Sequence, residues 1–171
     1  MSAAARAGRL AAALLALGAS GCGKGGSDPG GAPLEVTVGG KALQLVSGGV
    51  FRTNGQLRIH LTSSLDSCAA VNAIPVMTTT YLSFTVQPPT AGALAAAVLE
   101  TANALQPGQA TGRIQQQTGG AVTWAGFAAS DGTLRWSGGA TGDLTLEAID
   151  VGFAGAAGRV TATGLLLRAC N

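Results

Sequence analysis

The feature that most constrains the fold is Asn54-Gly55, which Phe51-Arg52-Thr53 precedes and an alternating segment follows. After this pair, Leu57, Ile59 and Leu61 alternate with polar residues, the period-two pattern of a strand with one buried face. Asn-Gly favours a two-residue hairpin turn, because both turn residues must adopt positive φ. The stretch therefore predicts a β-hairpin with an aliphatic inner face and a polar outer face.

The same pattern recurs along the chain. Residues 34–38 and 41–46 alternate on either side of Gly39-Gly40, which predicts a second hairpin. A strand that places Leu82, Phe84 and Val86 on one face follows later and ends at a Pro-Pro pair.

In the C-terminal third, Asp131-Gly132 and Gly138-Gly139 predict further turns, and 159–169 reads as the closing strand. Residues 91–105 are ambiguous, because alanine favours a short helix while the neighbouring segments are all strand-like. We favour strands over 93–100 and 109–117, with the short helix as the alternative.

Some eight to ten short strands joined by tight turns predict an all-β fold. We expect a single antiparallel β-sandwich over residues 34–171, with a β-barrel as the alternative.

Residues 1–21 have the three parts of an export signal. Arg6 and Arg9 precede an apolar run that is too short to span a bilayer, and Ala19-Ser20-Gly21 provides small residues at a cleavage site. Followed at once by Cys22, this stretch resembles the lipobox of bacterial lipoproteins, although Ala19 stands where that family prefers Leu.

The resemblance implies cleavage before Cys22, lipidation of its thiol with fatty acids such as palmitate, and anchoring in a membrane. The alternative is an ordinary secretory signal cleaved at the same bond. Residues 22–33 then comprise the lipidated cysteine and a Gly-rich flexible tether. Gly23 after the cysteine favours the outer membrane under the simplest sorting rule for such lipoproteins, with the side that the domain faces left open.

The chain contains three cysteines, an odd number for an oxidising compartment. If Cys22 carries lipid, Cys68 and Cys170 remain as one pair, and we expect them to form a disulfide. Two buried free thiols are the alternative.

The composition argues against several classes of function. Without the two leader arginines, eight basic residues balance eight acidic ones, so there is no electrostatic footprint for nucleic acid. His60, the single histidine, falls on the polar face of its strand, where we expect a solvated or rim position, and no serine lies in a G-x-S-x-G elbow. We therefore expect no catalytic residues and no enzyme activity, with an envelope hydrolase as the least favoured reading.

We also expect no metal and no cofactor. Asp143, Glu147 and Asp150, with Asp131, are the acids nearest to a calcium cluster, but they lack the spacing of a calcium loop. The residues that best suit ligand binding are Trp124, Trp136 and Tyr81, which would form an aromatic platform for sugar. The parity of Trp136 with Leu134 favours the core for that ring.

The sequence thus predicts a cell-envelope lipoprotein that acts as a non-catalytic structural or interaction module. A carbohydrate- or small-ligand-binding lipoprotein is the alternative. The membrane is the partner implied by the anchor, and the sequence does not specify a protein or glycan partner.

Overall fold

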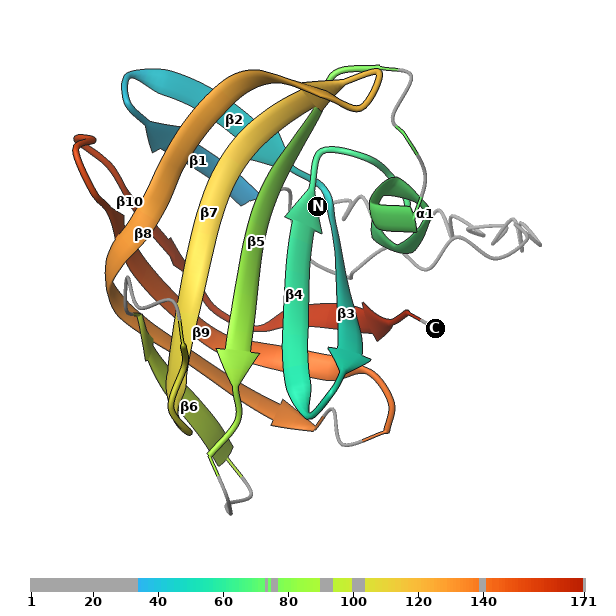
Figure 1. Cartoon of the computed structure of the whole chain (residues 1–171), viewed down its shortest axis with the longest axis vertical. Coiled ribbons are helices and arrows are strands. Elements are labelled where there is room, and N and C mark those ends of the chain that lie inside the picture. The colour runs from blue at the N-terminus through green and yellow to red at the C-terminus, as the bar shows by residue number, and fades with distance from the viewer. Residues whose placement is uncertain are drawn as a thin grey trace, which may run out of the picture.

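A computed structural model describes residues 34–72, 74, 77–89, 94–99, 104–138 and 141–170 of the chain. The described elements are almost all strands, so the expected all-β class is confirmed (Figure 1). In chain order the elements are β1 (Leu34–Val38), β2 (Lys41–Leu45), β3 (Ser47–Thr53), β4 (Gln56–Thr62), α1 (Ser67–Asn72), β5 (Thr79–Gln87), β6 (Leu94–Leu99), β7 (Gln109–Thr118), β8 (Ala121–Gly138), β9 (Leu144–Phe153), β10 (Arg159–Ala162) and β11 (Leu165–Ala169).

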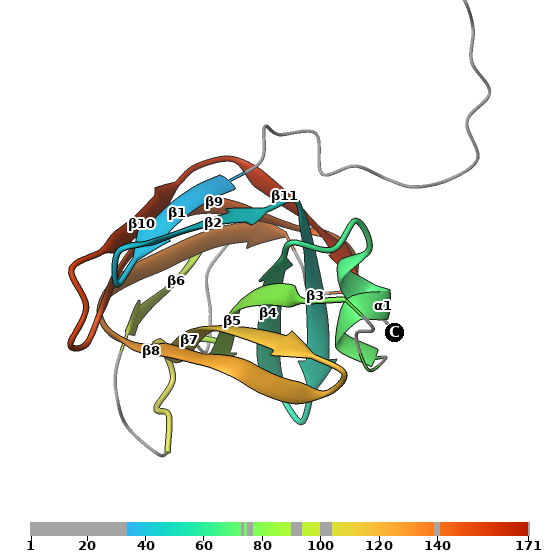
Figure 2. The ribbon, with the colours of Figure 1, turned by 90° about the horizontal axis from the view of Figure 1, so that it is seen from above.

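The main sheet closes on itself. Hydrogen-bonded pairings run from β3 through β4, β5, β7, β8, β9 and β11 and return to β3. Seen from above, these strands enclose one interior (Figure 2). The expected sandwich is therefore replaced by its alternative, a barrel, and only the β1–β2 hairpin forms a separate sheet.

Two short strands complete the ring where longer ones diverge. β6 lies between one end of β7 and one end of β8, parallel to β7 and antiparallel to β8. β10 pairs with β9 next to β11, so the predicted closing strand is present but is interrupted at Gly164, which has a φ of 68°. The barrel is not wholly antiparallel, because β11 also runs parallel to β3.

Aliphatic and aromatic side chains fill the interior of the barrel. Alternation places every second residue of each strand inside. The largest fully buried side chains are Phe84, Ile59, Leu82, Ile114, Leu134, Leu144, Leu146, Ile149, Leu167, Val38, Val50 and Val86.

The β1–β2 hairpin packs against β5 and β10 at the upper end of the view in Figure 1. Its buried side chains, Val36, Val38, Leu43 and Leu45, belong to the same core cluster as the barrel interior. The predicted turn is confirmed, since Gly39 and Gly40 have φ values of 58° and 73°.

The hairpin that the sequence predicts most strongly is also confirmed. Asn54 and Gly55 join β3 to β4 with φ values of 52° and 77°. In the ambiguous region, 94–99 and 109–118 are strands, in agreement with the favoured interpretation. Residues 90–93 and 100–103 lie outside the described residues.

The turn predicted at Asp131-Gly132 is wrong. These residues lie inside β8, at a bulge where the register against β9 shifts. Gly132 has a φ of 114°, and a Cβ on it would lie 1.9 Å from the carbonyl oxygen of Asp150. The glycine therefore lets two paired strands approach each other at a kink, and the chain continues in the same direction.

Candidate functional site

A groove lies on the outer face of the barrel, between α1 and the turn that joins β7 to β8. It has a volume of about 390 Å³. Its floor consists of His60, Tyr81, Ser83, Gln115 and Gln117, from β4, β5 and β7. One wall is formed by Ala70, Val71 and Asn72 of α1 with Ile74, and Gly120 of the β7–β8 turn lies opposite. We call this feature the His60 groove.

The strand pattern explains why these side chains share one face. Leu61, Leu82 and Ile114 point into the core, so their neighbours along each strand point outward. The register then aligns the outward residues in rows: His60 lies opposite Ser83, and Tyr81 lies opposite Gln115.

His60 is half-buried and lines this groove, within the expectation of a solvated or rim position. Its Nδ1 lies 2.9 Å from the Ser83 Oγ, and its ring meets Phe51 edge-on, with centroids 5.5 Å apart. Burial, with the charge of Arg58 as the second cause, lowers the pKa of His60 from 6.5 to about 4. The imidazole is therefore neutral at physiological pH.

The wall formed by α1 is a short helix over Ser67–Asn72. Asp66 begins the helix, because its Oδ1 accepts a hydrogen bond from the Ala69 amide at 3.0 Å. Tyr81 fixes the helix to the barrel, since its hydroxyl donates to the Ala70 carbonyl at 2.8 Å. Burial raises the pKa of Tyr81 above its usual value.

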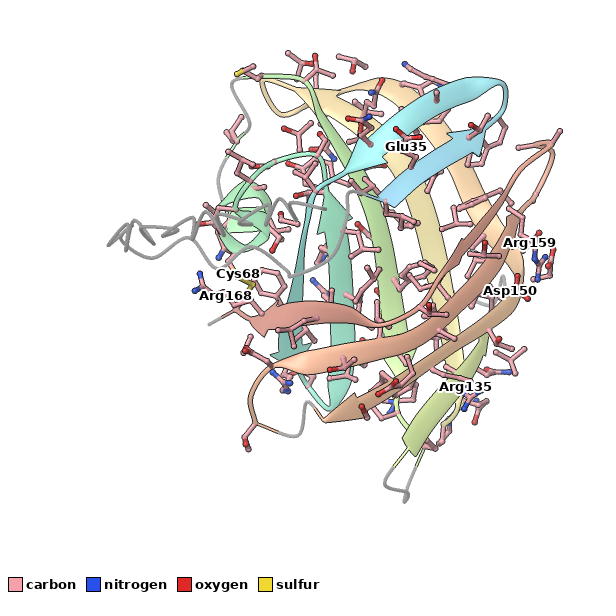
Figure 3. The ribbon with its side chains drawn as sticks, turned by 180° about the vertical axis from the view of Figure 1, so that it is seen from behind. Glu35, Cys68, Arg135, Asp150, Arg159 and Arg168 are labelled. Atoms are coloured by element: carbon pink, nitrogen blue, oxygen red, sulfur yellow. A yellow bond between two sulfur atoms is a disulfide. The ribbon has the colours of Figure 1, made fainter. Side chains whose placement is uncertain are left out.

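The expected disulfide is present and joins α1 to the end of β11. Cys68 and Cys170 are bonded, with their Cα atoms 5.4 Å apart (Figure 3). The Cys170 amide also donates to the Val50 carbonyl at 2.9 Å. Gly49 makes this approach possible, because a Cβ there would lie 2.7 Å from the Cys170 sulfur and 2.8 Å from the Ser67 hydroxyl.

His60 has no carboxylate partner in the part of the chain that the structure describes. Each acidic side chain there accepts a hydrogen bond from a residue other than His60. Glu35 accepts from Gln44, Asp66 from Ala69, Asp131 and Asp150 from Arg159, Asp143 from Ala169 and Glu147 from Ser137. A serine nucleophile needs a histidine base whose charged form is stabilised by a third group. The environment of His60 destabilises that form, so the His60–Ser83 pair is poorly suited to nucleophilic catalysis.

The three consecutive glutamines of β7 have different roles. Gln116 donates to the Thr80 hydroxyl at 2.9 Å and accepts from the Lys41 ammonium group. Gln115 and Gln117 point to the opposite face and line the His60 groove.

The aromatic platform expected from Trp124, Trp136 and Tyr81 does not form. Trp136 is only 3% exposed and belongs to the core, as its parity indicated, and Tyr81 is buried beneath α1. Trp124 is half-buried, with Phe127 against it edge-on and the Lys41 nitrogen 5.0 Å from its ring centroid. Only Tyr81 lines the His60 groove.

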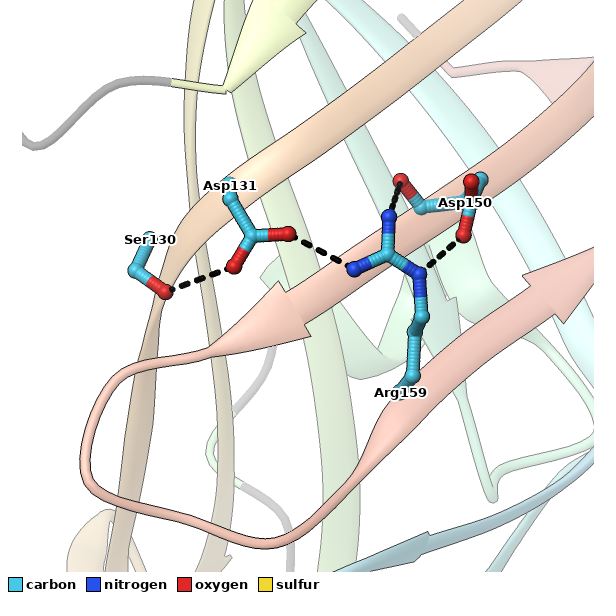
Figure 4. Close-up of polar contacts among 4 residues, drawn as sticks. All are labelled: Ser130, Asp131, Asp150 and Arg159. Atoms are coloured by element: carbon cyan, nitrogen blue, oxygen red, sulfur yellow. Dashed lines mark hydrogen bonds and ion pairs between the residues drawn. The ribbon is translucent and has the colours of Figure 1, made fainter.

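The acids weighed as calcium ligands have other partners. Arg159 of β10 bonds to Asp131 of β8 and to Asp150 of β9, linking three strands on the outer surface (Figure 4). Hydrogen bonds from Arg159 lower the pKa of both aspartates. Among the described residues no group of three or more His, Cys, Asp or Glu side chains is arranged to hold a metal ion.

The groove residues that the sequence did not single out as ligand-binding are His60, Ser83, Gln115 and Gln117. The alternation within each strand shows that these side chains point outward. Their proximity depends on the register of β4, β5 and β7, which no local pattern encodes. Asp66 followed by a small-residue segment was the available signal for α1.

Residues 1–33, with the leader, Cys22 and the tether, lie outside the described residues. In the part of the chain that the structure describes, no helix has the length and apolarity that crossing a membrane requires.

Comparison of the chain with protein-family models, with curated proteins and with solved structures gives no match.

Proposed function

We propose that the chain is an exported bacterial lipoprotein, anchored through Cys22, whose β domain is a non-catalytic interaction module of the cell envelope. The observation that carries the proposal is the Cys68–Cys170 disulfide. Disulfides persist in oxidising compartments outside the cytosol. With these two cysteines paired, Cys22 is the remaining thiol, at the position where a lipobox places its lipidated cysteine.

The surface around α1 supports an interaction role. Leu65 precedes the helix and is 86% exposed, while Ile74 and Met77 follow it and are 72% and 80% exposed. Large apolar side chains grouped at one place on a surface are typical of contact sites, whereas isolated ones are common everywhere. These three residues flank the helix that forms the wall of the His60 groove, so we place the contact face of the module there.

The chemistry of the groove favours binding over reaction. His60 is a weak base, and the described carboxylates are engaged elsewhere. A neutral imidazole beside a hydroxyl can donate and accept hydrogen bonds without any proton transfer.

The test compares the wild-type protein with Cys22→Ser in a bacterial host. We expect the wild-type protein to incorporate labelled palmitate and to sediment with the outer membrane, and Cys22→Ser to lose the label and become soluble in the periplasm. Cys68→Ser serves as the matched control and should keep its label. Wild-type protein that is exported without label would contradict the anchor, and protein retained in the cytosol would contradict the whole proposal.

A further inference from the structure

The His60 groove contains four hydrogen-bonding groups that no other described residue uses. The side-chain amides of Asn72, Gln115 and Gln117 line it, and within the described part of the chain none of them bonds to another protein group. His60 uses only Nδ1, through its contact with Ser83. Since every buried side-chain nitrogen and oxygen in that part has a partner, the free His60 Nε2 is in contact with solvent.

Some other side-chain amides of the domain are bonded to described residues, and some, such as Gln87 of β5, are not. Gln116, on the same strand, is bonded to Thr80, and Gln44 is bonded to Glu35. Gln115 and Gln117 are half-buried, and neither side chain is bonded to a described residue. Side-chain amides that are partly removed from water without a partner are favourable only where water or a ligand completes their hydrogen bonds.

The lining of the groove carries no formal charge. Its described residues are amides, hydroxyls, a neutral imidazole and small or aliphatic side chains, with no Asp, Glu, Lys or Arg among them. A charged ligand would lose water there without gaining an ionic partner. The groove therefore suits an uncharged ligand with many hydroxyl or amide groups.

Apart from Asn72, the wall facing the polar floor is apolar. Ala70, Val71 and Ile74 present methyl and methylene groups. A ligand that matches both surfaces has polar groups around its edge and one apolar face of C–H groups. A volume of about 390 Å³ is near the lower end of the ~300–1,000 Å³ typical of small-molecule sites.

We propose that the His60 groove is a binding site for a short neutral saccharide, a mono- or disaccharide unit. Gln115 and Gln117 bind its hydroxyl groups, His60 Nε2 provides a further hydrogen bond, and Val71 and Ile74 cover one face of the sugar ring. The inference rests on the proposed interaction role and names the class of ligand for it. It replaces the expected aromatic platform with an amide-lined site in which Tyr81 is retained but Trp124 and Trp136 are not.

The experiment titrates the full mature protein in detergent with a panel of neutral sugars, by calorimetry and ligand-observed NMR. The panel contains glucose, galactose, N-acetylglucosamine, maltose and chitobiose, with glucuronate and dialanine as charged and peptide comparators. We expect at least one neutral sugar to bind. Gln115→Ala and Gln117→Ala should each weaken that binding about tenfold, the effect of losing one well-formed hydrogen bond.

Gln87→Ala is the matched control, because Gln87 lies on the outer face of β5 but does not line the groove. Its affinity should equal that of the wild-type protein. Circular dichroism checks that each variant is folded. If Gln115→Ala does not fold, the test is made with Gln117→Ala alone. The proposal is overturned if no neutral sugar binds, if only glucuronate or dialanine binds, or if the groove variants bind as well as Gln87→Ala. None of these results affects palmitate labelling, so failure here is distinguishable from failure of the lipoprotein proposal.

Discussion

His60 makes the stability of the domain depend on pH in a range that lies mostly above the ordinary pKa values of carboxylates. Its pKa is about 4 in the folded protein and 6.5 in an unfolded chain. Between these values the unfolded state binds more protons than the folded state, so the free energy of unfolding falls as the pH drops. The loss begins near pH 6.5 and is complete near pH 4, with an upper limit of about 2–3 kcal/mol for a half-buried ring.

His60→Gln should remove this slope while keeping a hydrogen-bonding group opposite Ser83. Urea unfolding at a series of pH values between 4.5 and 7.5 measures it, with Gln87→Ala as a control that should retain the wild-type slope. A wild-type protein that is equally stable at about pH 4.5 and about pH 7 would show that His60 titrates normally.

Gly126 provides a second test at the scale of one residue. Its φ is 60°, and a Cβ there would lie 1.4 Å from the carbonyl oxygen of Ile114 on the neighbouring strand. Gly155 has a similar φ of 70°, but a Cβ there would meet nothing within 4 Å. The two glycines therefore separate the cost of backbone conformation from the cost of a clash.

We expect Gly155→Ala to lower the free energy of unfolding by about 1–2 kcal/mol, the cost of placing an L-residue in the left-handed region. Gly126→Ala should cost more than about 3 kcal/mol, because two paired strands must also separate. Urea denaturation of both variants decides this. Equal losses would mean that β7 and β8 are not packed this closely.

At the scale of elements, the disulfide holds α1 to the barrel and closes a long loop. Cys68 and Cys170 are separated by 102 residues, for which the chain-entropy model gives about 4–5 kcal/mol of stabilisation. This is a large fraction of the total stability of a typical domain, roughly 5–15 kcal/mol. We expect Cys170→Ser to lower the urea midpoint strongly, and Cys22→Ser to leave it unchanged.

The same variant reports on the groove, because α1 forms its wall. In native-state hydrogen exchange, the amides of α1 should lose protection when the disulfide is removed, before those of β4 and β5 do. If α1 keeps its protection in Cys170→Ser or after reduction, then the Tyr81 hydrogen bond and local packing hold the helix, and the disulfide does not.

The elements that the sequence predicts well are those specified by neighbouring residues. Asn54-Gly55 and Gly39-Gly40 define hairpins by their own backbone preferences, and both turns are present. Asp131-Gly132 has the same composition as a turn, but there the glycine serves a close contact with β9 across the sheet. A local sequence pattern cannot distinguish a glycine in a turn from a glycine at a close contact, because the difference depends on the position of the neighbouring strand.

At the scale of the whole molecule, closure of the sheet depends on contacts that join distant parts of the sequence. The parallel pairing of β11 with β3 unites the last strand with an early one, and no alternation pattern predicts it. The His60 groove depends on the same long-range order, since α1, β4, β5 and β7 must meet to form it. The cysteine count was the one long-range signal available, and the disulfide confirms it.

The most direct test of the lipoprotein account is mass spectrometry of the mature protein purified from membranes. The account predicts an N-terminal tryptic peptide that begins at Cys22 and ends at Lys24, with a mass increased by diacylglycerol and an amide-linked acyl chain. It also predicts that alkylation labels no cysteine before reduction and two after it, Cys68 and Cys170. A peptide that begins at Cys22 with an unmodified thiol, or one that retains the leader, would contradict the account.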